Sequence, residues 1–187
     1  GAVTWGFEFE NQPWFNGYRS MATNGVDKPV LNVFRMFGMM SGDRVKVSGD
    51  LAYDYLAVRD SSVRGEARDI NALAAIDGNK VTVLVWNYHD LNIISPSVPA
   101  DLIINNIETK SVMVTHYRID QENSNAYTLW MEMGSPQDVT DEQYQKLEAA
   151  GKLVQLSGPT PTDVEGDKVT IRANMEGQSV SLFVLEW

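Results

Sequence analysis

The sequence predicts a mainly β protein, in which a β-sandwich over residues 44–187 follows a strand–loop–helix segment. Three observations support this fold class. Beyond residue 44, short apolar runs alternate with turn residues, as in all-β domains. The runs VTVLVW and VSLFVLEW are apolar on both parities, which is typical of central strands in a packed sandwich. A hydrophobic content of 43% against 21% charged residues supplies enough apolar surface for a core.

The N-terminal segment contains three expected elements. Residues 2–10 are rich in aromatic and β-branched types and predict a strand, and residues 11–27 predict an irregular loop. A helix is expected over 29–40, because Pro29 suits a first turn and Gly42 follows the last apolar residue. Its apolar residues occupy most of the circumference, so most of this helix should be buried.

The rest of the chain predicts strands with one inserted helix. Asp77-Gly78-Asn79 and Glu176-Gly177-Gln178 predict two tight hairpins. A capping box of Thr140 and Gln143 predicts a helix at about 140–150. The clearest expected strands are Ala72–Asp77, Lys80–Tyr88, Asp101–Ile107, Ser111–Ile119, Lys168–Asn174 and Ser179–Glu186.

Charge and composition exclude several classes of function. The net charge is −10 and no basic tract interrupts it, so we expect neither nucleic acid nor an anionic membrane as a partner. No apolar run approaches the roughly 20 residues of a transmembrane helix. The absence of cysteine excludes disulfides and thiolate sites, but it leaves open a cytoplasmic or exported location. Gly1 in place of an initiator methionine is interpreted as the mark of a processed or cloned piece.

Motifs for nucleophilic, metal or cofactor chemistry are missing from the sequence. It holds no G-x-S-x-G elbow, no phosphate-binding G-x-x-x-x-G-K-[ST] and no G-x-G-x-x-G. Only two histidines occur, His89 and His116, both at or near ends of expected strands, and we interpret both as structural. We therefore predict no metal site and no cofactor.

Carboxylates near aromatic residues give the best indication of a binding site. Glu8 and Glu10 lie two apart on one expected strand, so both point to one face about 7 Å apart. Trp5, Trp14 and Phe15 are close in sequence, and aromatic planes beside acceptors suit a sugar. The two glutamates equally fit the solvent side of an amphipathic strand. Two neighbours on one face also fit a glycosidase pair poorly, because such a pair flanks the bond.

Two long stretches resemble a known family. The first is TWGFEFENQPWFNGYRSMATNGVDKPVLNVFRMFG, and the second is VWNYHD … VTHYRIDQENSNAYTLWMEMGSPQDVTDEQYQKLEAAGKL … VSLFVLEW. The first resembles the last strand, loop and helix of the (β/α)8 barrel of glycoside hydrolase family 39. The second resembles the β-sandwich that follows this barrel in bacterial β-xylosidases. Asp27–Leu31 and Ser124–Tyr127 are the most distinctive parts of the match.

The resemblance implies a retaining exo-glycosidase that removes terminal β-xylose. Both catalytic glutamates of that family belong to barrel strands four and seven, and the chain is expected to begin at strand eight. No catalytic residue is therefore assigned. The resemblance implies substrate binding by Trp5 and Glu10, with Glu8 as a further candidate.

Several residues keep two interpretations. Trp14 and Phe15 could rim the sugar pocket or pack against the sandwich, and Arg19 could bind substrate or form an ion pair. The polar loop Tyr117–Tyr127 could extend toward a barrel mouth or form a structural network. Aromatic residues of the expected strands and helices could form a carbohydrate-binding face or pack in the core: Trp86, Tyr88, Tyr117, Trp130 and Trp187.

The sequence thus predicts the C-terminal part of a family 39 β-xylosidase, inactive alone, with domains at 1–43 and 44–187. Its expected partners are a xylo-oligosaccharide and the barrel portion of the same protein. Self-association through the apolar helix at 29–40 is also expected. A free-standing carbohydrate-binding module and a purely structural or oligomerisation domain remain alternatives.

Overall fold

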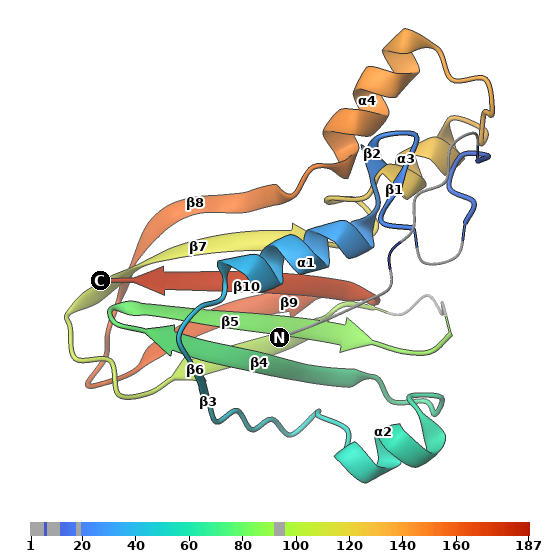
Figure 1. Cartoon of the computed structure of the whole chain (residues 1–187). Coiled ribbons are helices and arrows are strands. Elements are labelled where there is room, and N and C mark those ends of the chain that lie inside the picture. Colours follow the sequence, from blue (N-terminus) through green and yellow to red (C-terminus); the bar gives the residue numbers. More distant parts are fainter. Residues whose placement is uncertain (1–5, 7–11, 18–19, 92–95) are drawn as a thin grey trace. The chain divides into compact units, whose positions relative to one another are not determined.

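A computed structural model describes residues 6, 12–17, 20–91 and 96–187, which form two compact units (Figure 1). Unit 1 combines Gly1–Met39 with Ile119–Val154, and unit 2 combines Met40–Arg118 with Gln155–Trp187. Each unit is therefore built from two stretches that are far apart in sequence. The predicted domain boundary at residue 43 stays a prediction, since compactness alone does not define a domain.

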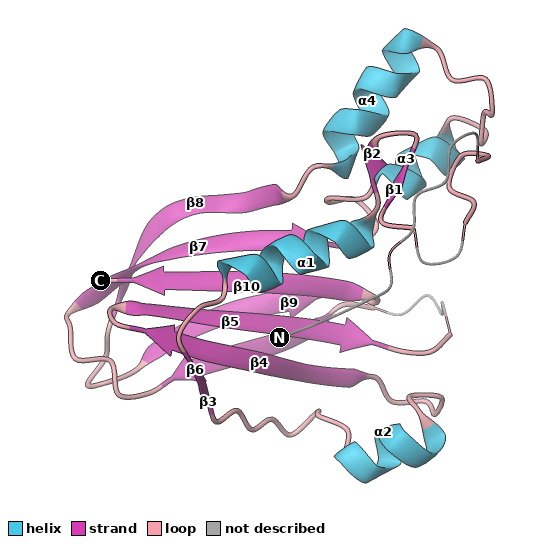
Figure 2. Cartoon of the chain, in the orientation of Figure 1, coloured by secondary structure: helices cyan, strands magenta, loops and turns pink. Residues whose placement is uncertain are grey.

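Unit 2 is built on strands (Figure 2), which confirms the mainly β prediction. A six-stranded sheet has the order β3-β4-β5-β10-β7-β8, and β6 pairs with β9 in a second, antiparallel sheet. The bounds of the six-stranded sheet are β3 Asp43–Val45, β4 Asp69–Asp77, β5 Lys80–Tyr88, β10 Ser179–Glu186, β7 Ser111–Ile119 and β8 Val154–Asp163. Those of the second sheet are β6 Val98–Ile104 and β9 Val169–Met175.

The two apolar runs form neighbouring central strands, as predicted. Strand β5 pairs antiparallel with β10, and Leu84 lies opposite Leu182. Consecutive residues of both strands are buried, so both faces of the sheet are covered at this point. The predicted hairpin at Asp77-Gly78-Asn79 is confirmed, because Asp77 pairs with Lys80 where β4 turns into β5.

The second predicted hairpin, at Glu176-Gly177-Gln178, is wrong. Strand β9 belongs to the two-stranded sheet and β10 to the six-stranded sheet, so this turn carries the chain from one sheet to the other. Gln178 adopts a φ of 55°, and its side-chain amide donates to the carbonyl of His89 at 2.6 Å. Turn residues alone do not show whether the strands that they join will pair with each other.

The two sheets of unit 2 share one hydrophobic core. Odd-numbered residues of β5 and β10 and even-numbered residues of β7 point into it, as the two-residue period of strands requires. The second sheet contributes Val169 and Met175, together with partly buried residues of β6. The fully or nearly fully buried members are Ile70, Ala74, Val81, Val83, Val85, Ile107, Val112, Val114, Val169, Met175, Phe183 and Leu185.

Unit 1 is built from helices and a small hairpin. The predicted helices at 29–40 and 140–150 are confirmed as α1 (Pro29–Met39) and α4 (Asp141–Gly151), and the Thr140 capping box is present. The structure adds three elements of unit 1 that were not expected: α3 (Ala126–Glu132), β1 (Ala22–Thr23) and β2 (Val26–Asp27). In unit 2 it adds α2 (Tyr55–Ser61) and the strands β3 and β8.

The prediction of an irregular loop over 11–27 is therefore wrong in its second half. Strand β1 pairs with β2 through the turn Asn24-Gly25. Asn24 has a φ of 47° and Gly25 a φ of 85°, the pair of positive values that a type I′ turn requires. The strand expected over 2–10 lies outside the described residues, apart from Gly6.

A buried amide joins the two stretches of unit 1. The side chain of Asn32 on α1 is fully buried, and its Nδ2 donates to the carbonyl of Gly151 at 2.7 Å. It also donates to the carbonyl of Ser124 at 3.3 Å, and its Oδ1 accepts from Arg35 at 2.7 Å. One side chain thus satisfies the last residue of α4 and the loop before α3.

Close backbone packing reinforces this junction. A Cβ atom at Gly151 would lie 2.8 Å from the carbonyl oxygen of Asp27, closer than such atoms approach. Glycine at this position therefore lets the end of α4 lie directly against β2. Within the described ranges, no helix combines the length and apolar character that crossing a bilayer would require.

Replacing Asn32 with alanine should destabilise unit 1 strongly. The variant Asn32→Ala leaves two buried carbonyls without a donor, which we expect to cost about 1–3 kcal/mol. Urea unfolding followed by tryptophan fluorescence measures this, because Trp14 and Trp130 lie in the core of unit 1. The control Gln145→Ala removes an exposed amide from α4 and should change stability by less than about 0.5 kcal/mol. Equal effects of the two substitutions would contradict a structural role for Asn32.

Candidate functional site

The residues predicted to bind substrate cannot be placed. Trp5, Glu8 and Glu10 lie outside the described residues, and so does Arg19. Their roles stay predictions from the resemblance. The described segment 12–17 follows two residues after Glu10 in the chain and contains Trp14 and Phe15.

Three hydrogen bonds hold this segment in place, two to residues outside it and one within it. The backbone N–H of Trp14 donates to Oε1 of Gln137 at 2.9 Å, and that of Phe15 donates to Oγ1 of Thr23 at 2.9 Å. Asn16 closes a turn by donating to the carbonyl of Pro13 at 3.1 Å. Phe15 has a φ of 55°, a strained value for a bulky residue, which persists only because the surrounding contacts fix it.

The two aromatic residues of the segment join an aromatic cluster, defined here as Trp14, Phe15, Tyr127, Trp130 and Tyr144. The ring centroid of Phe15 lies 5.1 Å from that of Trp130 and 5.4 Å from that of Tyr127. Trp14 meets Tyr144 edge to face at 6.2 Å. These distances lie in the favourable range for aromatic pairs. Trp14 therefore packs in the interior, whereas Phe15 connects that interior to the surface.

The rim of the cluster is exposed. Tyr127 is 46% exposed and Met131, one helical turn further along α3, is 50% exposed. Residues four apart lie on one face of a helix, so the two side chains form one surface. Next to them, Oγ1 of Thr128 and Oε1 of the exposed Gln121 lie 3.4 Å apart. The phenolic hydroxyl of Tyr127 makes no hydrogen bond to a residue that the structure describes.

The polar loop before Tyr127 forms a structural network, which is one of the two interpretations of the sequence. Oδ1 of Asp120 accepts the backbone N–H groups of Glu122 at 2.9 Å and Asn123 at 2.8 Å. Asn125 donates to the carbonyl of Asp120 at 2.9 Å and caps α3 through its side-chain oxygen. The cap fixes the first turn of α3, where Tyr127 is located.

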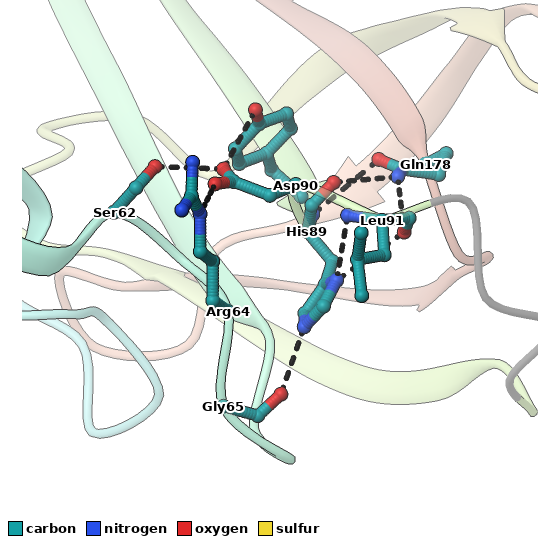
Figure 3. A network of polar contacts seen from close by, with 8 residues as sticks. Ser62, Arg64, Gly65, His89, Asp90, Leu91 and Gln178 are labelled. Carbon is teal, nitrogen blue, oxygen red and sulfur yellow. Dashed lines mark hydrogen bonds and ion pairs between the residues drawn. The ribbon is translucent and has the colours of Figure 1, made fainter.

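A second polar network lies in unit 2, at the end of β5 (Figure 3). Asp90 accepts hydrogen bonds from Ser62 at 2.7 Å, from Arg64 at 2.8 Å and from the hydroxyl of Tyr88 at 3.1 Å. The Arg64 bond, followed by that from Ser62, lowers the pKa of Asp90 from 3.8 to about 2. So acidic a carboxyl is a poor general base near neutral pH, and we interpret it as structural.

The histidines are also structural. In Figure 3, Nε2 of His89 lies 2.8 Å from the carbonyl of Gly65, while Nδ1 accepts the N–H of Leu91 at 3.0 Å. Both ring nitrogens of this fully buried side chain are thus engaged with backbone groups. His116 stacks on Phe183 at 4.2 Å and lies 2.9 Å from Oγ of Ser181.

A cleft of about 680 Å³ opens between the sheets of unit 2. Strands β4, β5 and β6 and the segment 46–51 form its walls, which are mostly aliphatic. No aromatic side chain lines it among the residues that the structure describes, so it lacks a surface on which a sugar ring could stack. In the described part of the chain, no three histidine or acidic side chains gather as metal ligands would.

The aromatic residues considered for a carbohydrate-binding face are distributed over both units. Trp130 belongs to the core of unit 1, and Trp187 packs against the core of unit 2. Nε1 of Trp86 donates to Asp69 at 2.8 Å, which fixes its ring beside β4. Core and structural packing therefore accounts for these three side chains.

Comparison with known proteins identifies the class of this fold. Two solved structures match most of the chain: a GH39 enzyme from Xanthomonas axonopodis pv. citri and a monomeric β-xylosidase from Caulobacter crescentus CB15. The match to the first structure has a TM-score of 0.70 and a sequence identity of 19%, and it covers 89% of this chain. The match to the second has a TM-score of 0.67 and a sequence identity of 18%, and it covers 90% of this chain. Each match spans 32% of the solved chain. The chain therefore shares its fold with about a third of each of these enzymes.

The sequence itself defines the family. Residues 7–169 match the model of glycosyl hydrolases family 39, so the chain belongs to this family. A β-xylosidase of Caldicellulosiruptor saccharolyticus is 24% identical over 147 residues, which make up 75% of this chain and 26% of that protein. The chain thus spans about a quarter of the length of this curated relative.

The exposed surface of Tyr127 and Met131 was not among the predicted site residues. The sequence holds one signal for it, because the two residues are four apart and therefore share a face of α3. The contact of Tyr127 with Phe15 joins residues more than 100 positions apart, which no local pattern reveals.

The pKa of Asp90 can be tested directly. A carbon-13 NMR titration of the side-chain carboxyl should give a midpoint of about 2. Arg64→Ala should raise this midpoint, because the Arg64 bond is the main cause of the shift. The control Arg59→Ala removes an exposed arginine paired with Asp60 and should leave the midpoint unchanged.

The same shift predicts how stability depends on pH. Because folding lowers the pKa, Asp90 contributes stability that is complete above 3.8 and is lost as the pH falls through about 2. The wild-type protein should therefore lose more stability over this interval than Asp90→Asn. A midpoint near 3.8 in the titration, or parallel stability curves for the two proteins, would show that Asp90 is not held as described.

Proposed function

We propose that this chain is the C-terminal part of a retaining exo-β-xylosidase. Residues 1–43 would be the final strand, loop and helix of a (β/α)8 barrel, and residues 44–187 the β-sandwich that follows it. The observation that carries this proposal is the family match over residues 7–169, which extends through both units. The names of the curated β-xylosidase and of the solved β-xylosidase support a β-xyloside as the substrate class.

In this proposal the chain supplies binding groups and not the catalytic pair. Retention requires two carboxyl groups about 5–5.5 Å apart, one as nucleophile and one as acid/base. Glu8 and Glu10 point to one face of the expected strand and cannot flank a bond in that way. Trp5 would stack on the xylose ring, and Glu10, with Glu8, would accept hydrogen bonds from its hydroxyl groups.

The alternative of a free-standing carbohydrate-binding module finds less support. The cleft of unit 2 has no aromatic lining among its described residues, and three of the five aromatic residues considered for a binding face serve packing. Self-association through α1 stays a prediction. On this helix Met36 is fully buried, Phe34 and Phe37 are partly buried, and Val30 is 44% exposed.

The chain alone should be hydrolytically silent. Without a nucleophile and a proton donor, no glycosyl-enzyme intermediate can form. Purified protein incubated with an aryl β-xyloside should release no aryl alcohol above the buffer blank, while the Caulobacter crescentus β-xylosidase serves as the positive control. Turnover that follows the protein through two columns and disappears in Glu8→Gln or Glu10→Gln would contradict the proposal.

Short xylosides should bind only weakly. A single pocket wall encloses little of a ligand, whereas small-molecule sites normally bury most of it. We expect xylobiose to bind with a dissociation constant of about 1 mM or weaker, equivalent to roughly 4 kcal/mol. Calorimetry or NMR titration of the chain measures this. A micromolar constant would instead favour a carbohydrate-binding module.

A further inference from the structure

We propose that the exposed rim of the aromatic cluster is a saccharide-binding platform, formed by Tyr127, Met131 and the edge of Phe15. It would receive a pyranose ring of the substrate beyond the xylose that is cleaved. This inference rests on the proposed function, since it takes a xylo-oligosaccharide as the ligand. It adds a second contact, on α3, to the predicted wall formed by Trp5 and Glu10.

Rigidity is the first argument for a binding role. The ring of Tyr127 is held at 5.4 Å by Phe15 and at 5.8 Å by Trp130, and Asn125 caps the helix turn that carries it. Trp130 is itself fixed, because its Nε1 donates to the carbonyl of Pro136 at 2.9 Å. A ring that is already immobile loses little conformational entropy on binding, so weak stacking contacts contribute fully.

The strain at Phe15 is the second argument. Phe15, a bulky residue, adopts a strained φ of 55°, and such residues occur preferentially at functional sites. Two hydrogen bonds, at Trp14 and at Phe15 itself, maintain this conformation. The strained backbone places the Phe15 ring against Tyr127 and Trp130, and so completes the apolar support beneath the exposed tyrosine.

The chemistry of the rim fits a sugar. A pyranose presents C–H groups on its faces and hydroxyl groups at its edge, and an exposed tyrosine with a thioether beside it suits the apolar face. The phenolic hydroxyl of Tyr127, together with Gln121 and Thr128, supplies donors and acceptors for the edge. This combination of an apolar surface with a few polar groups is typical of small-ligand sites.

Chain length brings the platform within reach of the predicted xylose subsite. Phe15 follows Glu10 by five residues, so their Cα atoms are separated by at most about 18 Å, the span of a fully extended chain. An oligosaccharide of several rings, longer than xylobiose, can bridge a separation near this limit. The platform should therefore matter for longer substrates.

The test uses the 187-residue chain titrated with xylotetraose and observed by NMR of the Met131 methyl group and the Tyr127 ring. Both signals should shift with a millimolar dissociation constant. Tyr127→Ala should weaken binding at least fivefold, and Tyr127→Phe, which keeps the ring, should weaken it less than threefold. The control Tyr55→Ala removes a tyrosine that is 73% exposed on α2 and should change binding less than twofold.

A second variant tests the proposal in case Tyr127→Ala does not fold. Met131→Gln changes an exposed side chain in α3, so the helix should remain intact while binding weakens at least twofold. The proposal is overturned if neither xylotetraose nor cellotetraose shifts the Tyr127 and Met131 signals, or if Tyr127→Ala and Tyr55→Ala behave alike. Shifts of these signals with cellotetraose but not with xylotetraose would support the platform and contradict the β-xyloside substrate.

Discussion

The buried side chain of Asn32 is the interaction on which the organisation of unit 1 depends. It connects helix α1 to the end of α4 and to the loop before α3, across 119 and 92 residues of sequence. A buried amide is stable only when its donors and acceptors are satisfied, so this contact selects one arrangement of the two stretches. Gly151 completes the junction, because only a residue without a Cβ lets α4 approach the carbonyl of Asp27 so closely. The same junction holds the loop of Trp14 and Phe15 beside α3, since Trp14, Trp130 and Leu147 share one core.

This arrangement suits the proposed role of the chain as a binding part of a glycosidase. In unit 2, the carboxylate and the imidazole that could act as catalytic groups have structural roles. Asp90 accepts three hydrogen bonds. Both ring nitrogens of His89 contact backbone groups. Unit 1, in contrast, presents an aromatic surface that packing leaves partly exposed at Tyr127. Binding energy from contacts remote from the reacting bond can be used for catalysis when these contacts are made in the transition state. A family 39 hydrolase would gain from the platform in this way.

Local patterns predicted most elements, and non-local contacts account for the errors. Strands β5 and β10 were identifiable because their apolar residues occupy both faces, and α4 because Thr140 and Gln143 form a capping box. The hairpin predicted at Glu176-Gly177-Gln178 is wrong, because the choice of partner strand depends on the arrangement of the whole sheet. The role of Asn32 depends on Gly151 and Ser124, which no local window contains. The platform was missed for the same reason, and the predicted residues Trp5, Glu8 and Glu10 lie outside the described part of the chain.

The two distant stretches of unit 1 are expected to fold as one body, which carries the proposed sugar-binding surface. Native-state hydrogen exchange as a function of denaturant tests it most directly, because it measures the opening free energy of each segment separately. The account predicts that the amides of α1 and α4 exchange with the same opening free energy and the same denaturant dependence. Protection of α4 together with rapid, denaturant-independent exchange in α1 would contradict it, because the two stretches would then open independently.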